Sequence, residues 1–177
     1  MVFEKTPLAG AWVIKPDLKT DERGYFARTF CEKEFAAHGL QTYFPQSNTS
    51  FNMLKGTLRG MHYQAAPHEE VKIVRCTRGA IYDVILDLRS GSATNGKWYA
   101  VELTENNGVS IYIPKGMAHG FITLVANTEV LYMMGEFFYP DCSRGVRWNE
   151  PLVNIKWPIR PEIISHADMV LPFLGGL

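Results

Sequence analysis

Short apolar segments alternate with turn residues along most of this chain. Runs rich in Val, Ile, Tyr and Phe are separated by Gly, Pro, Asn and Asp, which is the pattern of many strands joined by turns. We expect strands at residues 10–15, 24–30, 71–77, 80–88, 98–103, 109–113, 120–125 and 128–134. The pattern therefore predicts a mostly-β sandwich or barrel.

Two turn sequences mark expected hairpins, Arg-Gly at residues 78–79 and Glu-Asn-Asn-Gly at residues 105–108. Both favour antiparallel pairing of the strands that they join. Residues 32–38 form the one convincing short helix, because Gly39 follows where a left-handed cap would lie. We expect this helix to cover an edge of a sheet.

Composition indicates one well-buried globular domain spanning residues 1–177, since 46% of the residues are hydrophobic. The 18 Lys and Arg residues balance 18 Asp and Glu residues, so no overall field attracts nucleic acid or an anionic membrane surface. The cysteines are too few and too scattered for a disulfide framework. We expect all three to be reduced: Cys31, Cys76 and Cys142.

We expect neither a membrane span nor an export signal in this chain. Its apolar runs, such as residues 80–88, are much shorter than the roughly 20 residues of a membrane helix, and two aspartates interrupt that run. Residues 1–15 lack the apolar centre of a signal peptide. The sequence therefore predicts a cytoplasmic protein.

Two segments carry chemistry-bearing residues at a recognisable spacing. They read Gly56-x5-His62-x-Gln64-x4-Glu69 and Gly108-x5-Pro114-x-Gly116-x2-His119. This pair resembles the two motifs of the cupin superfamily, which line the inside of a small jelly-roll barrel. Metal-binding cupins take two histidines and a glutamate from the first motif and one histidine from the second.

Gln64 stands where the second histidine of a metal-binding cupin would be. An amide oxygen is a weaker ligand for Zn, Fe or Ni than imidazole, so the substitution favours a metal-free pocket. A metal-dependent oxygenase that uses His62, Gln64, Glu69 and His119 stays open as an alternative.

A longer signature narrows the resemblance. Residues 57–64 read Thr-Leu-Arg-Gly-Met-His-Tyr-Gln and look like the LRG-x-H-x-Q signature of the dTDP-4-dehydrorhamnose 3,5-epimerase family. Further segments agree with this family in order, at residues 21–26, 46–50, 112–121 and 144–148, so the resemblance covers roughly residues 7–172. Members of the family epimerise nucleotide-linked 4-keto-6-deoxyhexoses without a cofactor, in the synthesis of deoxysugars for polysaccharides or glycosylated metabolites.

The resemblance implies a role for each catalytic residue. His62 would remove the proton next to the ketone, and Asp168 would orient its ring. Tyr132 would return a proton on the opposite face, because a phenol with a pKa of about 10 holds its proton at pH 7. A carbon acid is far weaker than imidazolium, so the enolate must be stabilised as it forms. Lys72 is the natural partner of that enolate.

Strand parity supports the placement of Lys72. It lies two residues from Val74 and four from Cys76, so all three project to one face of a strand, and a lone ammonium there would point into the barrel. Parity also places Arg59 and His62 on opposite faces of a regular strand. A bulge near Gly60 would turn both side chains toward the same pocket.

Other positions match substrate contacts of the family. The resemblance implies that Arg59 and Arg23 bind the diphosphate, that Gln46 and Asn48 contact the nucleotide, that His119 holds the sugar or phosphate side, and that Phe138 stacks on the pyrimidine. Arg28 and Ser143 stand where relatives carry ligand-contacting glutamates. These departures leave the base open among thymine, cytosine and others, and leave the inverted carbon open between carbon 3, carbon 5 and both.

Other interpretations remain beside this one. A mono-epimerase, a 3,4-ketoisomerase and a sugar-nucleotide binding module without turnover each fit part of the pattern. Family resemblance implies a homodimer whose sheets combine, with Arg23 acting in the pocket of the partner subunit. Nothing in the sequence explains the segment at residues 67–70, just before Lys72.

Overall fold

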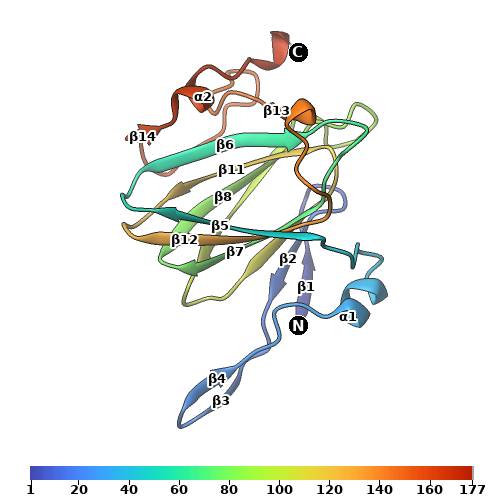
Figure 1. Ribbon diagram of the computed structural model, residues 1–177, viewed down its shortest axis with the longest axis vertical. Coiled ribbons are helices and arrows are strands. Elements are labelled where there is room, and N and C mark those ends of the chain that lie inside the picture. The colour runs from blue at the N-terminus through green and yellow to red at the C-terminus, as the bar shows by residue number, and fades with distance from the viewer. Residues whose placement is uncertain (177) are drawn as a thin grey trace.

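Two β-sheets lie face to face in the computed structural model, which describes residues 1–176 (Figure 1). Leu177, the last residue of the expected domain, lies outside the described residues. The first sheet has the order β1-β2-β10-β7-β12-β5. Its strands are β1 (Val2–Lys5), β2 (Trp12–Lys15), β10 (Ser110–Ile113), β7 (Lys72–Arg78), β12 (Thr128–Met134) and β5 (Gln46–Asn52).

The second sheet has the order β13-β6-β11-β8-β9, and β14 pairs with β6 in parallel. Its strands are β13 (Ser143–Gly145), β6 (Thr57–Gln64), β11 (Met117–Thr123), β8 (Ala80–Asp87), β9 (Trp98–Thr104) and β14 (Ile163–Ile164). A separate hairpin of β3 (Lys19–Asp21) and β4 (Gly24–Phe26) projects away from both sheets (Figure 1). This architecture confirms the predicted all-β jelly-roll fold class, whereas extension of the sheets across a dimer stays a prediction.

Both expected hairpins are wrong as strand pairings. The turn at residues 78–79 carries the chain from β7 in the first sheet to β8 in the second, and residues 105–108 carry it from β9 back to β10. The three-dimensional pairing outweighs the local turn signal, because β8 pairs along its length with β11 and β9 rather than with β7. The turns are therefore corners between the sheets.

Alternation along the strands sets the inner and outer faces. Val74 and Cys76 of β7, Ile81 and Ile85 of β8, and Phe121 of β11 belong to the buried core between the sheets. Outward positions alternate with them, as at Val84, which packs on the other side of the second sheet. Inward positions near one end of the same strands carry polar side chains instead, and these form the cavity described below.

Helices and irregular segments cover the outer faces. Helix α1 (Glu32–Ala37), which confirms the predicted helix, buries Phe35 against Ile14, Ile73 and Tyr112 on the outside of the first sheet. It therefore covers a face rather than the expected sheet edge. The remaining helices are short: η1 (Pro140–Cys142), α2 (His166–Met169) and η2 (Leu174–Gly176). Within residues 1–176, no helix has the length and apolar character required to cross a bilayer.

The C-terminal segment runs over the outside of the second sheet, as Figure 1 shows above β6. Val146, Val153 and Ile155 pack there against Val84 and Leu86 of β8. Helix α2 of this tail lies against β6. The tail thereby brings residues near the C-terminus beside the signature strand.

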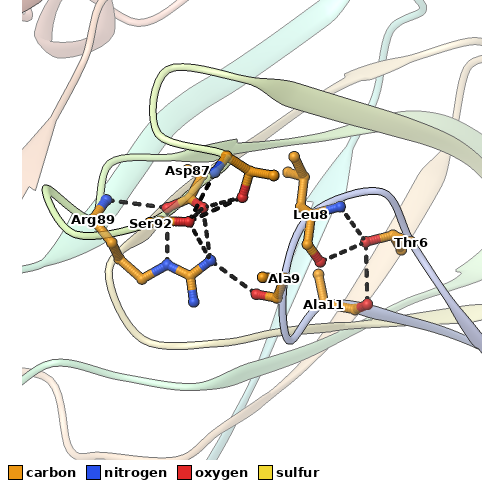
Figure 2. A network of polar contacts seen from close by, with 8 residues as sticks. Thr6, Leu8, Ala9, Ala11, Asp87, Arg89 and Ser92 are labelled. Carbon is orange, nitrogen blue, oxygen red and sulfur yellow. Dashed lines mark hydrogen bonds and ion pairs between the residues drawn. The ribbon is translucent and has the colours of Figure 1, made fainter.

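A buried aspartate fixes the loop after β8 (Figure 2). The fully buried Asp87 accepts hydrogen bonds from Arg89 Nε at 2.8 Å, Ser92 Oγ at 2.6 Å and Thr94 Oγ1 at 2.6 Å. Arg89 also donates to the carbonyl of Ala9 at 2.8 Å, which ties the loop to the turn between β1 and β2. Burial opposes ionisation, but these donors together lower the pKa of Asp87.

Candidate active site

A cavity of about 280 Å³ opens between the two sheets. Its volume lies just below the range of about 300–1,000 Å³ typical for whole small ligands, which suits a single sugar ring. Strands β5, β7 and β12 of one sheet and β6 and β11 of the other line it. The lining residues are Asn48, Thr49, Ser50, Arg59, His62, Lys72, His119, Phe121, Tyr132 and Met134.

His62 and Tyr132 reach this cavity from opposite sides. His62 belongs to β6 of the second sheet, whereas Tyr132 belongs to β12 of the first. His62 pairs in register with His119 of β11, so two imidazoles are neighbours on one wall. The site therefore presents an imidazole and a phenol across one small space.

The predicted bulge is present in β6. Arg59 pairs with Phe121 and His62 with His119, so three steps along β6 match two along β11. Gly60 has a φ of +126°, and a Cβ there would lie 2.5 Å from the Cα of Gly120. Only glycine allows this backbone path and close approach. The bulge lets Arg59 and His62 line the same cavity.

Asp168 holds His62 from behind. Its Oδ1 lies 2.6 Å from His62 Nε2, and its Oδ2 accepts a hydrogen bond from the Gly60 N–H at 3.2 Å. Ser165 caps α2 by accepting from the Asp168 N–H at 3.1 Å. Burial opposes ionisation, but the His62 hydrogen bond leads the contacts that lower the pKa of Asp168. An ionised carboxylate only accepts hydrogen bonds, so His62 Nε2 carries the proton and donates it to Asp168. This leaves Nδ1 of His62 as the unprotonated, basic nitrogen.

His119 has a carboxylate partner of its own. Its Nε2 lies 2.7 Å from Asp83 Oδ2, and both side chains are buried. Complete burial raises the pKa of Asp83, although the charge of His119 and, more weakly, that of Lys72 act in the opposite direction. The other oxygen of Asp83, Oδ1, is buried without a hydrogen-bond partner among the described residues.

Tyr132 presents its hydroxyl toward β5. The oxygen lies 3.2 Å from Ser50 Oγ, and the ring lies 6.2 Å from the ring of His119 in an edge-on arrangement. Burial raises the pKa of Tyr132 well above its usual value, and the hydrogen bond with Ser50 offsets only part of this effect. The phenol is therefore protonated throughout the neutral range.

Lys72 points into the cavity, as strand parity predicted, but the expectation of a lone ammonium is wrong. Its Nζ lies 2.8 Å from Glu70 Oε1, and only 10% of the Lys72 side chain and 7% of the Glu70 side chain are exposed. A buried ammonium needs a compensating charge, and the chain supplies one two residues earlier.

Residues expected to bind the nucleotide lead from the cavity to the surface. Asn48 lines the cavity, and its Oδ1 accepts from Gln46 Nε2 at 3.2 Å. Gln46 Oε1 accepts from the Phe138 N–H at 3.2 Å, and the Phe138 side chain is exposed. Arg59 is oriented within the cavity by Asn52, whose Oδ1 accepts from its Nε at 2.8 Å.

Three expected binding residues lie away from the cavity of their own chain. Arg23 is on the exposed hairpin, where it pairs with Asp21 at 2.6 Å. Arg28 pairs with Glu34 at 2.7 Å beside the start of the chain. Ser143 lies on β13, where it pairs in register with Gln64 at the end of β6.

The cupin-type metal ligands do not converge here. Gln64 donates to the carbonyls of His68 at 2.9 Å and Phe137 at 3.1 Å, and its oxygen accepts from the Tyr139 N–H at 2.6 Å. His62 and His119 are committed to carboxylates. Across residues 1–176, no group of three or more His, Cys, Asp or Glu is placed to hold a metal ion. The residues present do not fit a cupin metal centre.

Sequence reasoning missed several members of the site. Thr49, Phe121 and Met134 line the cavity, while Asp83 and Glu70 pair with its charged groups. A signal existed for Asp83, because an acidic residue inside the apolar run at residues 80–88 must have a buried partner.

Comparison with known proteins assigns the chain to a family. The family model described as dTDP-4-dehydrorhamnose 3,5-epimerase matches residues 5–175. The dTDP-4-dehydrorhamnose 3,5-epimerase of Methanothermobacter thermautotrophicus is 43% identical, over 94% of this chain and 90% of that protein. The chain belongs to the dTDP-4-dehydrorhamnose 3,5-epimerase family. The predicted family and the predicted class of enzyme, an isomerase, are both confirmed.

Solved structures of dTDP-4-dehydrorhamnose 3,5-epimerase family members share the whole fold. The Bacillus anthracis enzyme, with TDP and PPi bound, has a TM-score of 0.95 at 38% identity, covering 98% of this chain and 99% of that one. A Legionella pneumophila epimerase in complex with dTDP-4-keto-L-rhamnose has a TM-score of 0.92 at 32% identity, covering 98% and 93%. This likeness confirms the jelly-roll fold class.

Proposed function

We propose that this protein epimerises a nucleoside-diphosphate 4-keto-6-deoxyhexose next to its ketone, with His62 as the base and Tyr132 as the acid. The observation that carries the proposal is the entry of these two residues into one cavity from opposite sheets. Inversion at carbon requires a proton to leave one face and another to arrive at the other. The bound sugar therefore lies between the two side chains.

Proton removal uses the His62 and Asp168 pair. Nδ1 of His62 takes the proton from the carbon next to the ketone, while Nε2 keeps its hydrogen bond to Asp168 Oδ1. The ionised carboxylate stabilises the imidazolium that forms. The His62 side chain is 45% exposed, so the imidazolium can lose its proton to water before the next step.

The ketone oxygen becomes an oxyanion as the proton leaves. Lys72 donates a hydrogen bond to that oxygen in a poorly screened site, where a charged donor stabilises the enolate most strongly. Tyr132 then protonates the carbon from the opposite face, and the phenolate that remains regains a proton from water before the next turnover. Burial raises the pKa of its hydroxyl and so keeps the proton available at neutral pH.

The diphosphate and base occupy the mouth of the cavity, because the cavity itself suits only a sugar. Arg59 and His119 bind the phosphate and sugar side. Asn48, Gln46 and Phe138 form a path toward the surface, along which the nucleotide lies with its base on the exposed Phe138 ring. Ser143, which pairs with Gln64 at the C-terminal end of β6, contributes to binding the nucleotide. The TDP bound in the Bacillus anthracis relative supports dTDP as the carrier.

The active form in this proposal is a homodimer. The β3–β4 hairpin projects from the body (Figure 1), and the Phe26 and Tyr25 rings on it are exposed. Exposed aromatics on a projecting hairpin favour burial against a second copy. Arg23, and with it Arg28 at the base of the hairpin, would then serve the partner's cavity.

Mixing inactive variants tests the dimer. Arg23→Ala and His62→Ala subunits are purified separately, then mixed after mild dissociation. If Arg23 acts in trans, mixed dimers contain one intact site and regain activity, whereas an active monomer by sedimentation rejects the dimer.

We place the enzyme in the cytoplasm, the compartment that the three unpaired thiols of Cys31, Cys76 and Cys142 favour.

The reaction itself is tested with dTDP-, CDP- and GDP-linked 4-keto-6-deoxyhexoses in parallel in heavy water, followed by NMR. Deuterium at carbon 3, carbon 5 or both identifies the nucleotide and the inverted centre together. Uptake at one carbon only would assign a mono-epimerase. A product whose carbonyl has moved would assign a ketoisomerase, and absence of uptake from every substrate rejects the proposal.

A further inference from the structure

The ion pair between Glu70 and Lys72 is among the most buried charge contacts of the cavity. The two charged atoms lie 2.8 Å apart, and 10% or less of either side chain is exposed. We propose that Glu70 is a positioning residue, which holds the Lys72 ammonium at the place where the ketone oxygen of the substrate lies. This inference rests on the proposed role of Lys72 in the reaction.

The segment at residues 67–70, which the sequence left unexplained, is built to deliver Glu70. Gln64 Nε2 donates to the carbonyl of His68, and Gln64 Oε1 accepts from the Tyr139 N–H. The His68 ring stacks on the Tyr139 ring with centroids 3.5 Å apart. Gln64 therefore has a structural use in place of metal binding: it fixes the segment that ends at Glu70.

Lys72 has a second acidic neighbour within the barrel. Its charge acts on the carboxyl of Asp83, which already pairs with His119 through Oδ2. Asp83 Oδ1 is buried and has no hydrogen-bond partner among the described residues, so it is an open acceptor for an ammonium. Glu70 competes with this acceptor and keeps Lys72 at the cavity wall.

Loss of the Glu70 charge would release Lys72 toward Asp83. The ammonium would then lie deeper in the barrel, away from the oxygen that becomes negative. Displacement by 1 Å can slow a reaction by about a hundredfold, because oxyanion stabilisation depends on exact placement of the donor. Binding of the nucleotide would change little, since Arg59, Asn48 and Phe138 carry it.

The experiment compares Glu70→Gln with Glu69→Gln. The glutamine keeps the size and the acceptor oxygen at residue 70, and Glu69 is a neighbouring, less buried glutamate outside the ion pairs of residues 1–176. We expect Glu70→Gln to lower kcat by about tenfold to a hundredfold. The dissociation constant for dTDP, measured by calorimetry, should remain near that of the parent, whereas the melting temperature should fall because the buried Lys72 ammonium loses its charged partner. Glu69→Gln should leave all three unchanged.

A double variant separates positioning from general stability. If Glu70 acts through Lys72, Glu70→Gln should have no further effect on kcat in the Lys72→Ala background. Additive losses in the double variant, or an unchanged kcat in Glu70→Gln, would overturn the inference. If Glu70→Gln does not fold, Glu70→Asp replaces it: the shorter side chain should lower kcat in a folded protein, and a parental kcat overturns the inference. Failure of the parent protein to turn over any substrate would instead reject the proposed function.

Discussion

His62 Nε2 lies 2.6 Å from Asp168 Oδ1, although the two residues are 106 positions apart in sequence. Asp168 belongs to the one-turn helix α2, and β14 just before it pairs with the start of β6. The C-terminal tail therefore contacts β6 at two places: β14 pairs with its start, and Asp168 of α2 binds His62 farther along the strand. The base of the proposed reaction depends on a residue that the tail delivers.

Replacing Asp168 with Asn should preserve the contact but remove the charge. We expect kcat to fall by about 10²–10⁴-fold. The imidazolium would lose its negative partner, and the neutral ring would no longer be held in the tautomer that has its proton on Nε2. Steady-state kinetics measure the change, and the exposed Asp17→Asn serves as the control. Activity within twofold of the parent would show that His62 does not need this carboxylate.

Tyr132→Phe should separate proton removal from inversion. His62 can still exchange the substrate proton with heavy water on its own face, so exchange with retained configuration should continue. Inversion should fall by about 10²–10⁴-fold because the opposite-face acid is missing. Tyr112→Phe is the matched control, since Tyr112 is a buried tyrosine in the outer cluster beneath α1. Parental inversion in Tyr132→Phe would assign the acid to another group.

Gly60→Ala should damage both stability and activity. The added Cβ would lie 2.5 Å from the Gly120 Cα at a φ of +126°, and we expect a loss of about 1–3 kcal/mol in the free energy of unfolding. Denaturant unfolding measures it. Gly91→Ala, where nothing lies within 4 Å of the new methyl, should be nearly neutral. Equal stability of the two variants would contradict the close packing of the bulge.

Asp87→Asn should destabilise the fold in a pH-dependent manner. The donors around Asp87 lower its folded pKa below the unfolded value of about 3.9, so its contribution is complete above that pH and disappears as the pH falls through the folded pKa. We expect a loss of about 1–3 kcal/mol at pH 7. The difference in melting temperature from the parent should shrink below about pH 4.

Asp141→Asn, an exposed aspartate, is the control for the Asp87 experiment. Its melting temperature should follow that of the parent at every pH. A stability difference for Asp87→Asn that stays constant down to acidic pH would indicate lost packing rather than a lost charge.

Much of the fold could be predicted from the alternation of apolar and polar residues. Strands β7 to β12 are apolar enough to be recognised, and Gly39 marks the end of α1. Strand β5 reads Gln-Ser-Asn-Thr-Ser-Phe-Asn and was not expected from pattern, because one of its faces lines a polar cavity and little of it is buried. The two corners at residues 78–79 and 105–108 resembled hairpins, since a turn sequence does not reveal which sheet its strands join.

The site could be predicted where parity and the family signature agreed. His62, Lys72, His119 and Tyr132 do meet in one cavity, and the register shift at Gly60 was foreseen from the conflict between Arg59 and His62. The acidic partners of Lys72 and His119 were not. Asp83 reaches His119 from a neighbouring strand, and Glu70 precedes Lys72 by two residues just outside the strand, so both pairings depend on the three-dimensional path of the backbone.

The proposed reaction inverts a carbon between two proton carriers on opposite faces of the sugar. The most direct measurement is NMR of the product formed from dTDP-4-keto-6-deoxyglucose in heavy water with the parent protein. We expect deuterium at a carbon next to the ketone together with inverted configuration at that same carbon. Deuterium with retained configuration, or no deuterium while the protein is folded and binds dTDP, would contradict it.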